Sequence, residues 1–194
     1  MNEPIVGIGS NKLTFKTRIC KPCNNERTQP YDCAWQLLSK YLQTHWPIIV
    51  KNGYFSLLNV FPKDTQKYAL HVHLYFVKLL GCKLVEEKVP INIGRFSEAL
   101  LSGRSHRDVF LTFANAPEIP TFDGELIFSS RVEFGHYNSC LPDMGLWTYM
   151  LHPVAMRIAY LSPSSPHAFR SNTWHPNQAG NKVHLGMYHP QIAG

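Results

Sequence analysis

The chain of 194 residues is 44% hydrophobic and 12% aromatic, enough apolar content for one folded domain with tails and too much for wholesale disorder. No stretch approaches the roughly eighteen continuous apolar residues that a membrane-spanning helix requires. The glycine-broken apolar run near the start is too short for a signal peptide, so we expect a protein that starts in the cytosol. The 5 cysteines, an odd number, favour reduced thiols over a disulfide framework.

The formal net charge of +6 lies entirely in the two terminal regions. Residues 1–30 carry a net charge of +3, residues 31–150 are neutral, and residues 151–194 carry +3 with no acidic side chain. A neutral body with basic ends can dock on phosphate, in nucleic acid or in anionic lipid headgroups. The alternative is that the charge serves only solubility.

Residues 1–12 are glycine-rich and predict a flexible arm. The arm cannot bury its apolar side chains locally. Docking them on a neighbouring copy would make a head-to-tail contact that propagates into filaments or lattices, whereas the alternative is simple disorder. The candidate self-association residues are Pro4, Ile5, Val6 and Ile8.

Residues 13–20 alternate apolar and polar side chains, which predicts a half-exposed strand, and the polar residues 21–30 predict a loop. Basic side chains on and around this strand would act as point charges without base readout, so their binding should be salt-sensitive and sequence-blind. The candidate phosphate-binding residues are Lys12, Lys16, Arg18 and Lys21.

A broad apolar face with helical spacing predicts a helix from Tyr31 to Trp46, with Asp32 as N-cap and Pro47 as its end. Asn52-Gly53 follows between two β-prone runs, residues 48–50 and 54–61, and is a strong hairpin signal.

The segment from Tyr68 to Leu84 fits both helical and strand periodicity, and Gly81 could end a helix there. Residues 86–107 predict a long loop with one short helical turn. Its apolar side chains could form a patch that touches a membrane or a partner, or they could fold back onto the core. These residues are Ile91, Ile93, Phe96, Leu100 and Leu101.

Strands are predicted from Asp108 to Phe113 and from Glu125 to Phe134, whereas the apolar segment from Trp147 to Tyr160 could be helix or strand. Residues 163–194 show no sustained period and predict an irregular tail or a strap across the domain. The predicted organisation is an arm (1–12), a globular domain (13–162) and this C-terminal segment.

Motifs for catalysis or metal binding are weak. Cys20 and Cys23 have a metal-type spacing but lack two further ligands at matching distance, and His71 and His73 would share one side only on a strand. No nucleophile elbow, phosphate-binding loop, zinc-protease motif or dinucleotide fingerprint is present. We therefore expect a non-enzymatic protein without a cofactor or a metal.

The order of elements resembles the matrix proteins of rhabdoviruses over residues 12–160. The segment TFKTRICKPCNNERTQPYDCAWQLLSKYLQTHW (14–46) is similar to the first strand and helix of that family, and HLYFVKLLG (73–81) is similar to its second helix. The segment FDGELIFSSRVEFGHYN (122–138) resembles its later paired strands. Departures are the absence of a P-P-x-Y or P-T-A-P motif and of a dense N-terminal lysine cluster, and an extra stretch at 47–66, which fit a divergent or plant-infecting member.

The resemblance implies an α+β fold, an antiparallel sheet packed by two or three helices. It also implies a structural protein that polymerises beneath the viral envelope and condenses the nucleocapsid. The expected partners are other copies of the chain, the nucleoprotein–RNA nucleocapsid, an anionic membrane surface and the viral glycoprotein. The expected locations are the virion, the host cytoplasm and membranes, and the nucleus.

A second hypothesis is a viral nucleic-acid-binding protein, such as a silencing suppressor or a movement protein, that binds single-stranded RNA. Its basic ends would contact phosphate, and exposed aromatic side chains would stack on bases. The candidates for stacking are Phe169, Trp174 and Tyr188.

Overall fold

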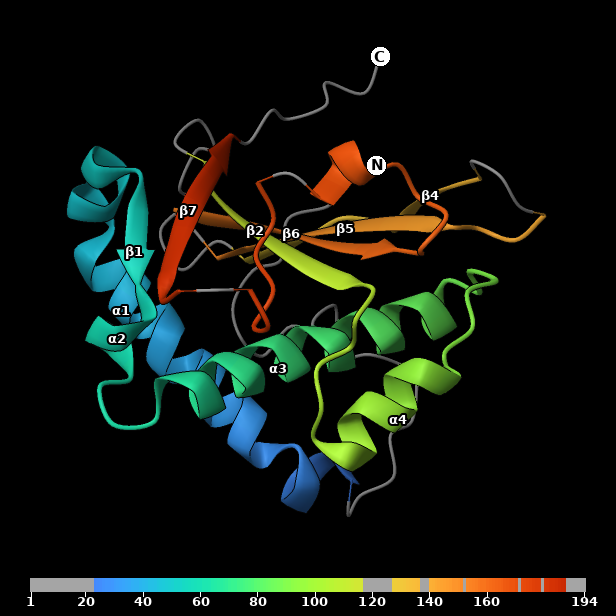
Figure 1. Ribbon diagram of the computed structural model, residues 1–194, viewed down its shortest axis with the longest axis horizontal. Coiled ribbons are helices and arrows are strands. Elements are labelled where there is room, and N and C mark those ends of the chain that lie inside the picture. Colours follow the sequence, from blue (N-terminus) through green and yellow to red (C-terminus); the bar gives the residue numbers. More distant parts are fainter. Residues whose placement is uncertain are drawn as a thin grey trace.

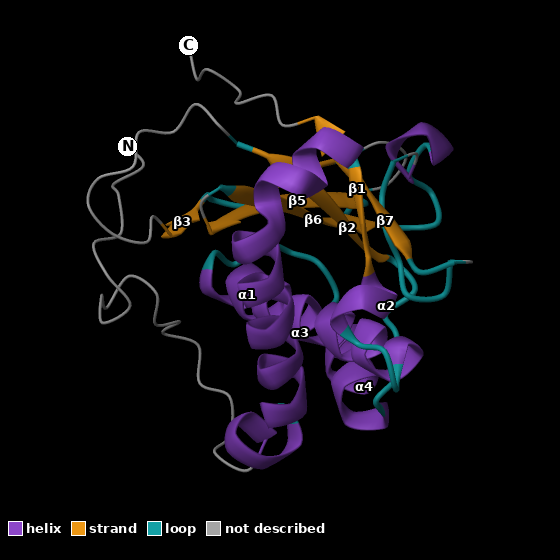
Figure 2. Ribbon diagram, turned by 90° about the vertical axis from the view of Figure 1, so that its left-hand side faces the viewer, coloured by secondary structure: helices purple, strands orange, loops and turns teal. Residues whose placement is uncertain are grey.

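Helices and a sheet form two stacked layers in the computed structural model, with the helices on one face of the sheet (Figures 1 and 2). The structure describes residues 23–116, 127–136, 140–151, 153–170, 172–178 and 180–187. The helices are α1 (Gln29–Asn52), α2 (Leu57–Val60), α3 (Thr65–Glu86) and α4 (Gly94–Ser102), with a short π-helical turn (Cys23–Arg27) before α1 and a 3-10 turn (His167–Arg170) late in the chain. The predicted α+β class is confirmed.

Helix α1 is longer than predicted at both ends. Thr28 precedes its first turn as the N-cap, so the assignment of that role to Asp32 was wrong. The helix also continues through Pro47, whose ring is exposed, and ends where Gly53 adopts a left-handed φ of 73° and donates its N–H to the Ile49 carbonyl. The predicted strand at residues 48–50 is therefore helical, and Asn52-Gly53 ends a helix instead of turning a hairpin.

Helix α3 resolves the ambiguous segment in favour of helix. Gly81 lies inside it, not at its end. The Phe96 ring of α4 rests on this position, so that a Cβ added to Gly81 would lie 3.4 Å from the ring. On the other side, Phe76 meets Trp35 of α1 edge to face with the ring centroids 4.9 Å apart. Helix α3 is thus the centre of the helical layer.

The sheet has seven strands in the order β1-β7-β2-β6-β5-β3, with β4 also paired to β5. The strands are β1 (Tyr54–Ser56), β2 (Val109–Asn115), β3 (Ile127–Ser129), β4 (Glu133–Gly135), β5 (Met144–Leu151), β6 (Val154–Leu161) and β7 (Lys182–Met187). All pairs are antiparallel except β2 with β7.

The strand predictions are confirmed in part. The strand predicted from Asp108 to Phe113 is β2, the one predicted from Glu125 to Phe134 is divided into β3 and β4, and the undecided segment from Trp147 to Tyr160 is the hairpin of β5 and β6. The strand predicted at residues 13–20 lies outside the described residues. The C-terminal segment was wrongly predicted to be irregular, because β7 pairs with both β1 and β2. Its register aligns Val183 with Phe55 of β1 and Leu185 with Phe113 of β2.

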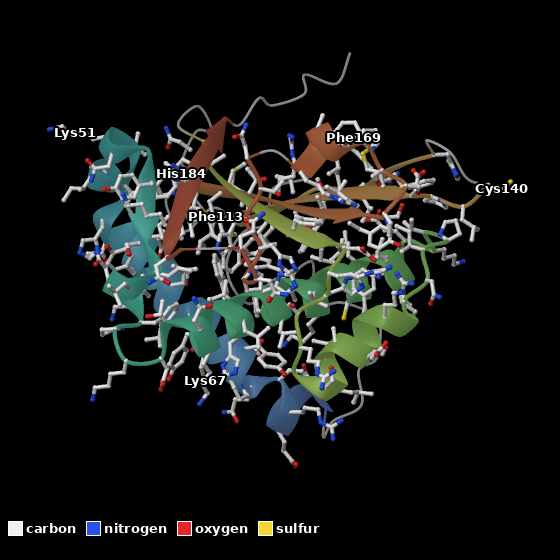
Figure 3. The ribbon with its side chains drawn as sticks, viewed as in Figure 1. Lys51, Lys67, Phe113, Cys140, Phe169 and His184 are labelled. Atoms are coloured by element: carbon white, nitrogen blue, oxygen red, sulfur yellow. The ribbon has the colours of Figure 1, made fainter. Side chains whose placement is uncertain are left out.

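Alternation along the strands divides the sheet into a helix-covered face and an outer face. In β6, Met156 and Ile158 belong to the main core with the helices, whereas Ala159 and Leu161 belong to a separate small cluster with Phe110. Phe113 of β2 likewise belongs to the main core with the helices, and Figure 3 shows Phe169 on the side of the sheet away from the helices.

Candidate functional site

The outer face of the sheet carries a groove of about 620 Å³. Strands β2, β5, β6 and β7 form its floor, and the segment that follows β6 forms one wall. The lining residues are Thr112, Met144, Leu146, Arg157, Ala159, Leu161, Ala168, Phe169, Asn172, Thr173, Leu185 and Gly186. Most of these side chains are small or apolar, which makes the groove suitable for an apolar segment of another chain.

A strap, residues 162–170 and 172–176, holds the wall of the groove in place. Arg170 donates from Nη2 to the Ser162 carbonyl at 2.8 Å, and its guanidinium lies 5.6 Å from the centre of the Phe110 ring. Trp174 forms a two-bond bridge to Leu111 of β2, with N···O distances of 2.6 and 2.9 Å. These anchors leave Phe169 on the wall with 49% of its surface exposed.

One cation lies in the floor of the groove. Arg157 of β6 is aligned with Thr112 of β2 on one side and with Thr148 of β5 on the other. Gly186 of β7 lies close to Thr112, because a Cβ added to Gly186 would be 2.5 Å from Thr112 Cγ2. The floor therefore combines a positive charge with closely packed small residues.

Three buried histidines lie between the helical layer and the strap. His73 of α3 accepts the His106 backbone N–H at its Nε2 (3.1 Å), and His175 Nε2 lies 3.2 Å from the His106 carbonyl oxygen. The His73 and His175 rings meet edge to face with centroids 4.9 Å apart. Because His175 Nδ1 accepts the Asn177 N–H, the neutral ring carries its proton on Nε2 and donates it to His106.

Burial keeps these imidazoles neutral. Loss of hydration lowers the pKa of His73 well below its ordinary value, and it lowers the pKa of His106 to about 4 although Asp108 opposes that shift. The pKa of His175 is also lowered by burial. The histidines therefore act as hydrogen-bonding core residues near neutral pH.

The predicted self-association and phosphate-binding residues, from Pro4 to Lys21, lie outside the described residues. The predicted apolar patch is only partly exposed. Ile91 and Phe96 are buried in the main core at 6% and 2% exposure, so their assignment to a membrane-touching or partner-touching surface was wrong. The reason is that α4 is amphipathic and turns Phe96 onto α3.

The rest of the predicted patch has a different environment. Ile93 and Leu101 are exposed at 39% and 59%, and Leu100 packs partly against the core. The aromatic candidates of the second hypothesis are likewise divided: Phe169 is exposed, Trp174 is 8% exposed, and Tyr188 lies outside the described residues.

Sequence reasoning missed the groove and its residues. An arginine inside the apolar run VAMRIAYL of β6 was the available signal, because a strand covered on both faces would have no place for it. His71 and His73 lie on α3, where side chains two residues apart diverge. Across the described ranges, no group of three or more His, Cys, Asp or Glu side chains is arranged to hold a metal ion.

The side chains of Cys33, Cys82 and Cys140 form no disulfide bond among the described residues, and burial raises the pKa of Cys82 to about 11. Within the described part of the chain, no helix is both long enough and apolar enough to cross a membrane. No protein-family model, curated protein or solved structure matches this chain at a significant level.

Proposed function

We propose that this chain is a non-enzymatic matrix-type protein of an enveloped virus. It self-associates, lies against the inner surface of the membrane and condenses the nucleocapsid during assembly. The observation that carries this function is the groove on the outer face of the sheet, an apolar recess of about 620 Å³ with an exposed phenylalanine on its wall. The resemblance of residues 12–160 to rhabdovirus matrix proteins supplies the viral setting.

The occupant of the groove is the N-terminal arm of a second copy. The arm offers Pro4, Ile5 and Val6, whose side chains match the small and apolar lining. Glu3 directly precedes them and is complementary in charge to Arg157 in the floor. An apolar segment next to one acid thus fits an apolar groove with one cation.

Such a contact joins different surfaces of the two copies. A head-to-tail contact of this kind leaves one groove and one arm free at the ends of every oligomer, so assembly continues unless the rotation closes a ring. The basic terminal regions then supply the contacts to nucleocapsid phosphate and to anionic lipid.

Analytical ultracentrifugation at falling ionic strength, on the full chain and on a chain without residues 1–12, tests self-association. We expect open-ended oligomers of the full chain and monomers of the shortened chain. Monomers of both at every ionic strength would contradict the proposal and favour the single-stranded nucleic-acid binder.

A charge exchange tests the groove itself. Arg157→Glu should abolish the oligomers, and Glu3→Arg in the same chain should restore them, because the ion pair is then reversed. Ile48→Ser is the control, since Ile48 is 61% exposed on α1 in the other layer. Equal loss of oligomers in the control, or no recovery in the double variant, would exclude the groove as the contact.

A further inference from the structure

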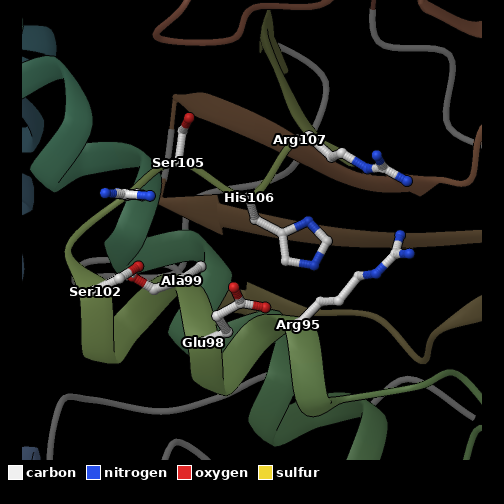
Figure 4. Close-up of a pocket in the computed structure, with 8 residues that line it drawn as sticks. Arg95, Glu98, Ala99, Ser102, Ser105, His106 and Arg107 are labelled. Carbon is white, nitrogen blue, oxygen red and sulfur yellow. Dashed lines mark hydrogen bonds between the residues drawn. The ribbon is translucent and has the colours of Figure 1, made fainter.

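A second recess, on the opposite side of the sheet from the groove, lies between α4 and the segment that leads into β2 (Figure 4). Its volume is about 290 Å³, at the small end of ligand sites. The residues that line it are Arg95, Glu98, Ala99, Ser102, Arg104, Ser105, His106 and Arg107. Three of the eight are arginines and one is acidic, so the lining is positively charged.

Asp108 forms ion pairs with two of the arginines, Arg95 and Arg107. Arg95 Nη1 lies 3.1 Å from Asp108 Oδ2 and Arg107 Nε lies 3.3 Å from Asp108 Oδ1, while the carboxylate is only 4% exposed. The side chains of Arg95 and Arg107 remain 52% and 65% exposed. One carboxylate cannot neutralise two guanidinium groups or use all of their N–H donors, so donors remain for an anion.

His106 adds a buried donor. Its side chain is 3% exposed, and Figure 4 shows the ring in the recess beside Arg95. Nδ1 accepts the Asp108 backbone N–H at 3.2 Å, so the neutral ring carries its proton on Nε2. Among the described residues, Nε2 has no hydrogen-bond partner. A buried N–H without an acceptor is costly, and a ligand oxygen would supply the acceptor.

We propose that this recess binds a phosphate monoester, either as a small soluble molecule or as a lipid headgroup. Guanidinium groups match phosphate oxygens in geometry and charge, and the imidazole Nε2–H and the hydroxyls of Ser102 and Ser105 are further donors. Glu98 on the rim repels additional negative charge and can accept from a hydroxyl of the ligand. This site does not depend on the groove or on the arm.

Isothermal titration calorimetry of the full chain with inorganic phosphate measures the site directly. We expect saturable binding, with an affinity that falls about tenfold or more in Arg104→Gln. Among the described residues no hydrogen bond or ion pair of the Arg104 side chain is seen, so this change should not unfold the protein. Lys51→Gln, which removes one exposed charge from the far end of α1, should leave the affinity within about twofold.

The imidazole resonances of His106 provide a second measurement. A phosphate in the recess should shift its Nε2 resonance in the wild-type chain and leave it unmoved in Arg104→Gln. Absence of saturable binding, equal losses in both variants, or a His106 signal that never responds would overturn the proposal.

Vesicles then identify the source of the phosphate. Phosphatidic acid presents a monoester and phosphatidylserine a diester, so vesicles of phosphatidylcholine with either lipid at equal surface charge separate headgroup recognition from bulk attraction. Binding that prefers phosphatidic acid and needs Arg104 assigns the site to a headgroup. Vesicle binding independent of Arg104, with phosphate binding still dependent on it, assigns the site to a soluble ligand.

Discussion

The two faces of the sheet differ in what they are built from. The helix-covered face carries large side chains, among them Trp147, Phe113 and Ile158, which interlock with aromatic residues of α1 and α3. The outer face carries small clusters such as Ala114, Met150 and Ala155, and an arginine lies in its floor. Stability is therefore concentrated on one face, and the other is left open for contact.

This contrast predicts that equal chemical changes have unequal effects on the two faces. Substitutions under the helices should reduce the free energy of unfolding most, whereas substitutions in the groove should cost less stability and, at its exposed wall, act on association.

The largest effect is expected in the helical layer. Phe76→Ala should lower the free energy of unfolding by about 4 kcal/mol, because Phe76 is fully buried and contacts both Trp35 and Tyr149. Urea denaturation measures the change. Leu37→Ala, at a 52% exposed position of α1, is the control and should stay within about 0.5 kcal/mol. A loss in Phe76→Ala no greater than in the control would remove the basis of the comparison.

The next effect concerns pH and the histidines between the layers. Imidazole in the unfolded chain titrates near its ordinary pKa of 6.5, whereas the pKa of folded His106 is about 4, because burial disfavours its charged form. The unfolded state thus binds more protons below pH 6.5, so the free energy of unfolding decreases as the pH is lowered. We expect His106 alone to contribute a loss of about 2 kcal/mol between pH 7 and pH 5.

Urea denaturation at several pH values, together with an NMR titration of the His106 ring, checks this prediction. Asp108 and Arg95 face the same ring and act on its pKa in opposite directions. An unfolding free energy that is flat from pH 7 to pH 5, or a His106 ring that titrates near pH 6.5, would contradict it.

A smaller effect is expected on the outer face. Gly186→Ala should cost about 1 to 2 kcal/mol, because the new methyl group would lie 2.5 Å from Thr112 Cγ2. Thr112→Ser removes that methyl group and should restore most of the stability in the double variant. Thermal denaturation measures the three variants. If the loss of stability in the double variant equals the sum of the losses in Gly186→Ala and Thr112→Ser, the two residues do not compete for the same space.

The smallest effect on stability is expected on the wall of the groove. Phe169→Ser should change the free energy of unfolding by less than about 0.5 kcal/mol and yet weaken self-association. Phe134→Ser is a matched control, since Phe134 is 51% exposed and Phe169 49%, and Phe134 lies outside the groove. Sedimentation velocity on both variants distinguishes a specific contact, which only Phe169→Ser weakens, from nonspecific hydrophobic association, which both variants weaken equally.

Local signals predicted a good part of the helical layer. The period of apolar residues identified most of α1, and the resemblance favoured a helical α3, because these features depend on neighbours three or four residues apart. The same signals failed at Pro47, Asn52 and Gly53. The predicted proline stop and hairpin did not occur, because the helix tolerates an exposed proline and needs a glycine at its end.

The groove on the outer face of the sheet could not be predicted from such local signals. The groove exists only because β7 and the strap both pair with β2. Leu185 of β7 lies 72 residues from its partner Phe113, and Trp174 of the strap lies 63 residues from its partner Leu111. His106 illustrates the same limit, because its neighbours His73 and His175 come from a helix and from the strap. The spacing of these three histidines in the sequence does not predict that they lie together.

The position of β7 has a consequence for synthesis of the chain. Strand β7 lies between β1 and β2, so Tyr54 and Phe55 have no strand partner until residues 183 and 184 have left the ribosome. Until then, the edge of β2 that β7 covers is exposed, and an exposed edge strand invites pairing with other chains. A nascent chain arrested before residue 180 should therefore bind chaperones and aggregate more readily than one released after residue 187. On this view, the sheet closes late in biosynthesis, when copies of the chain are crowded on one messenger.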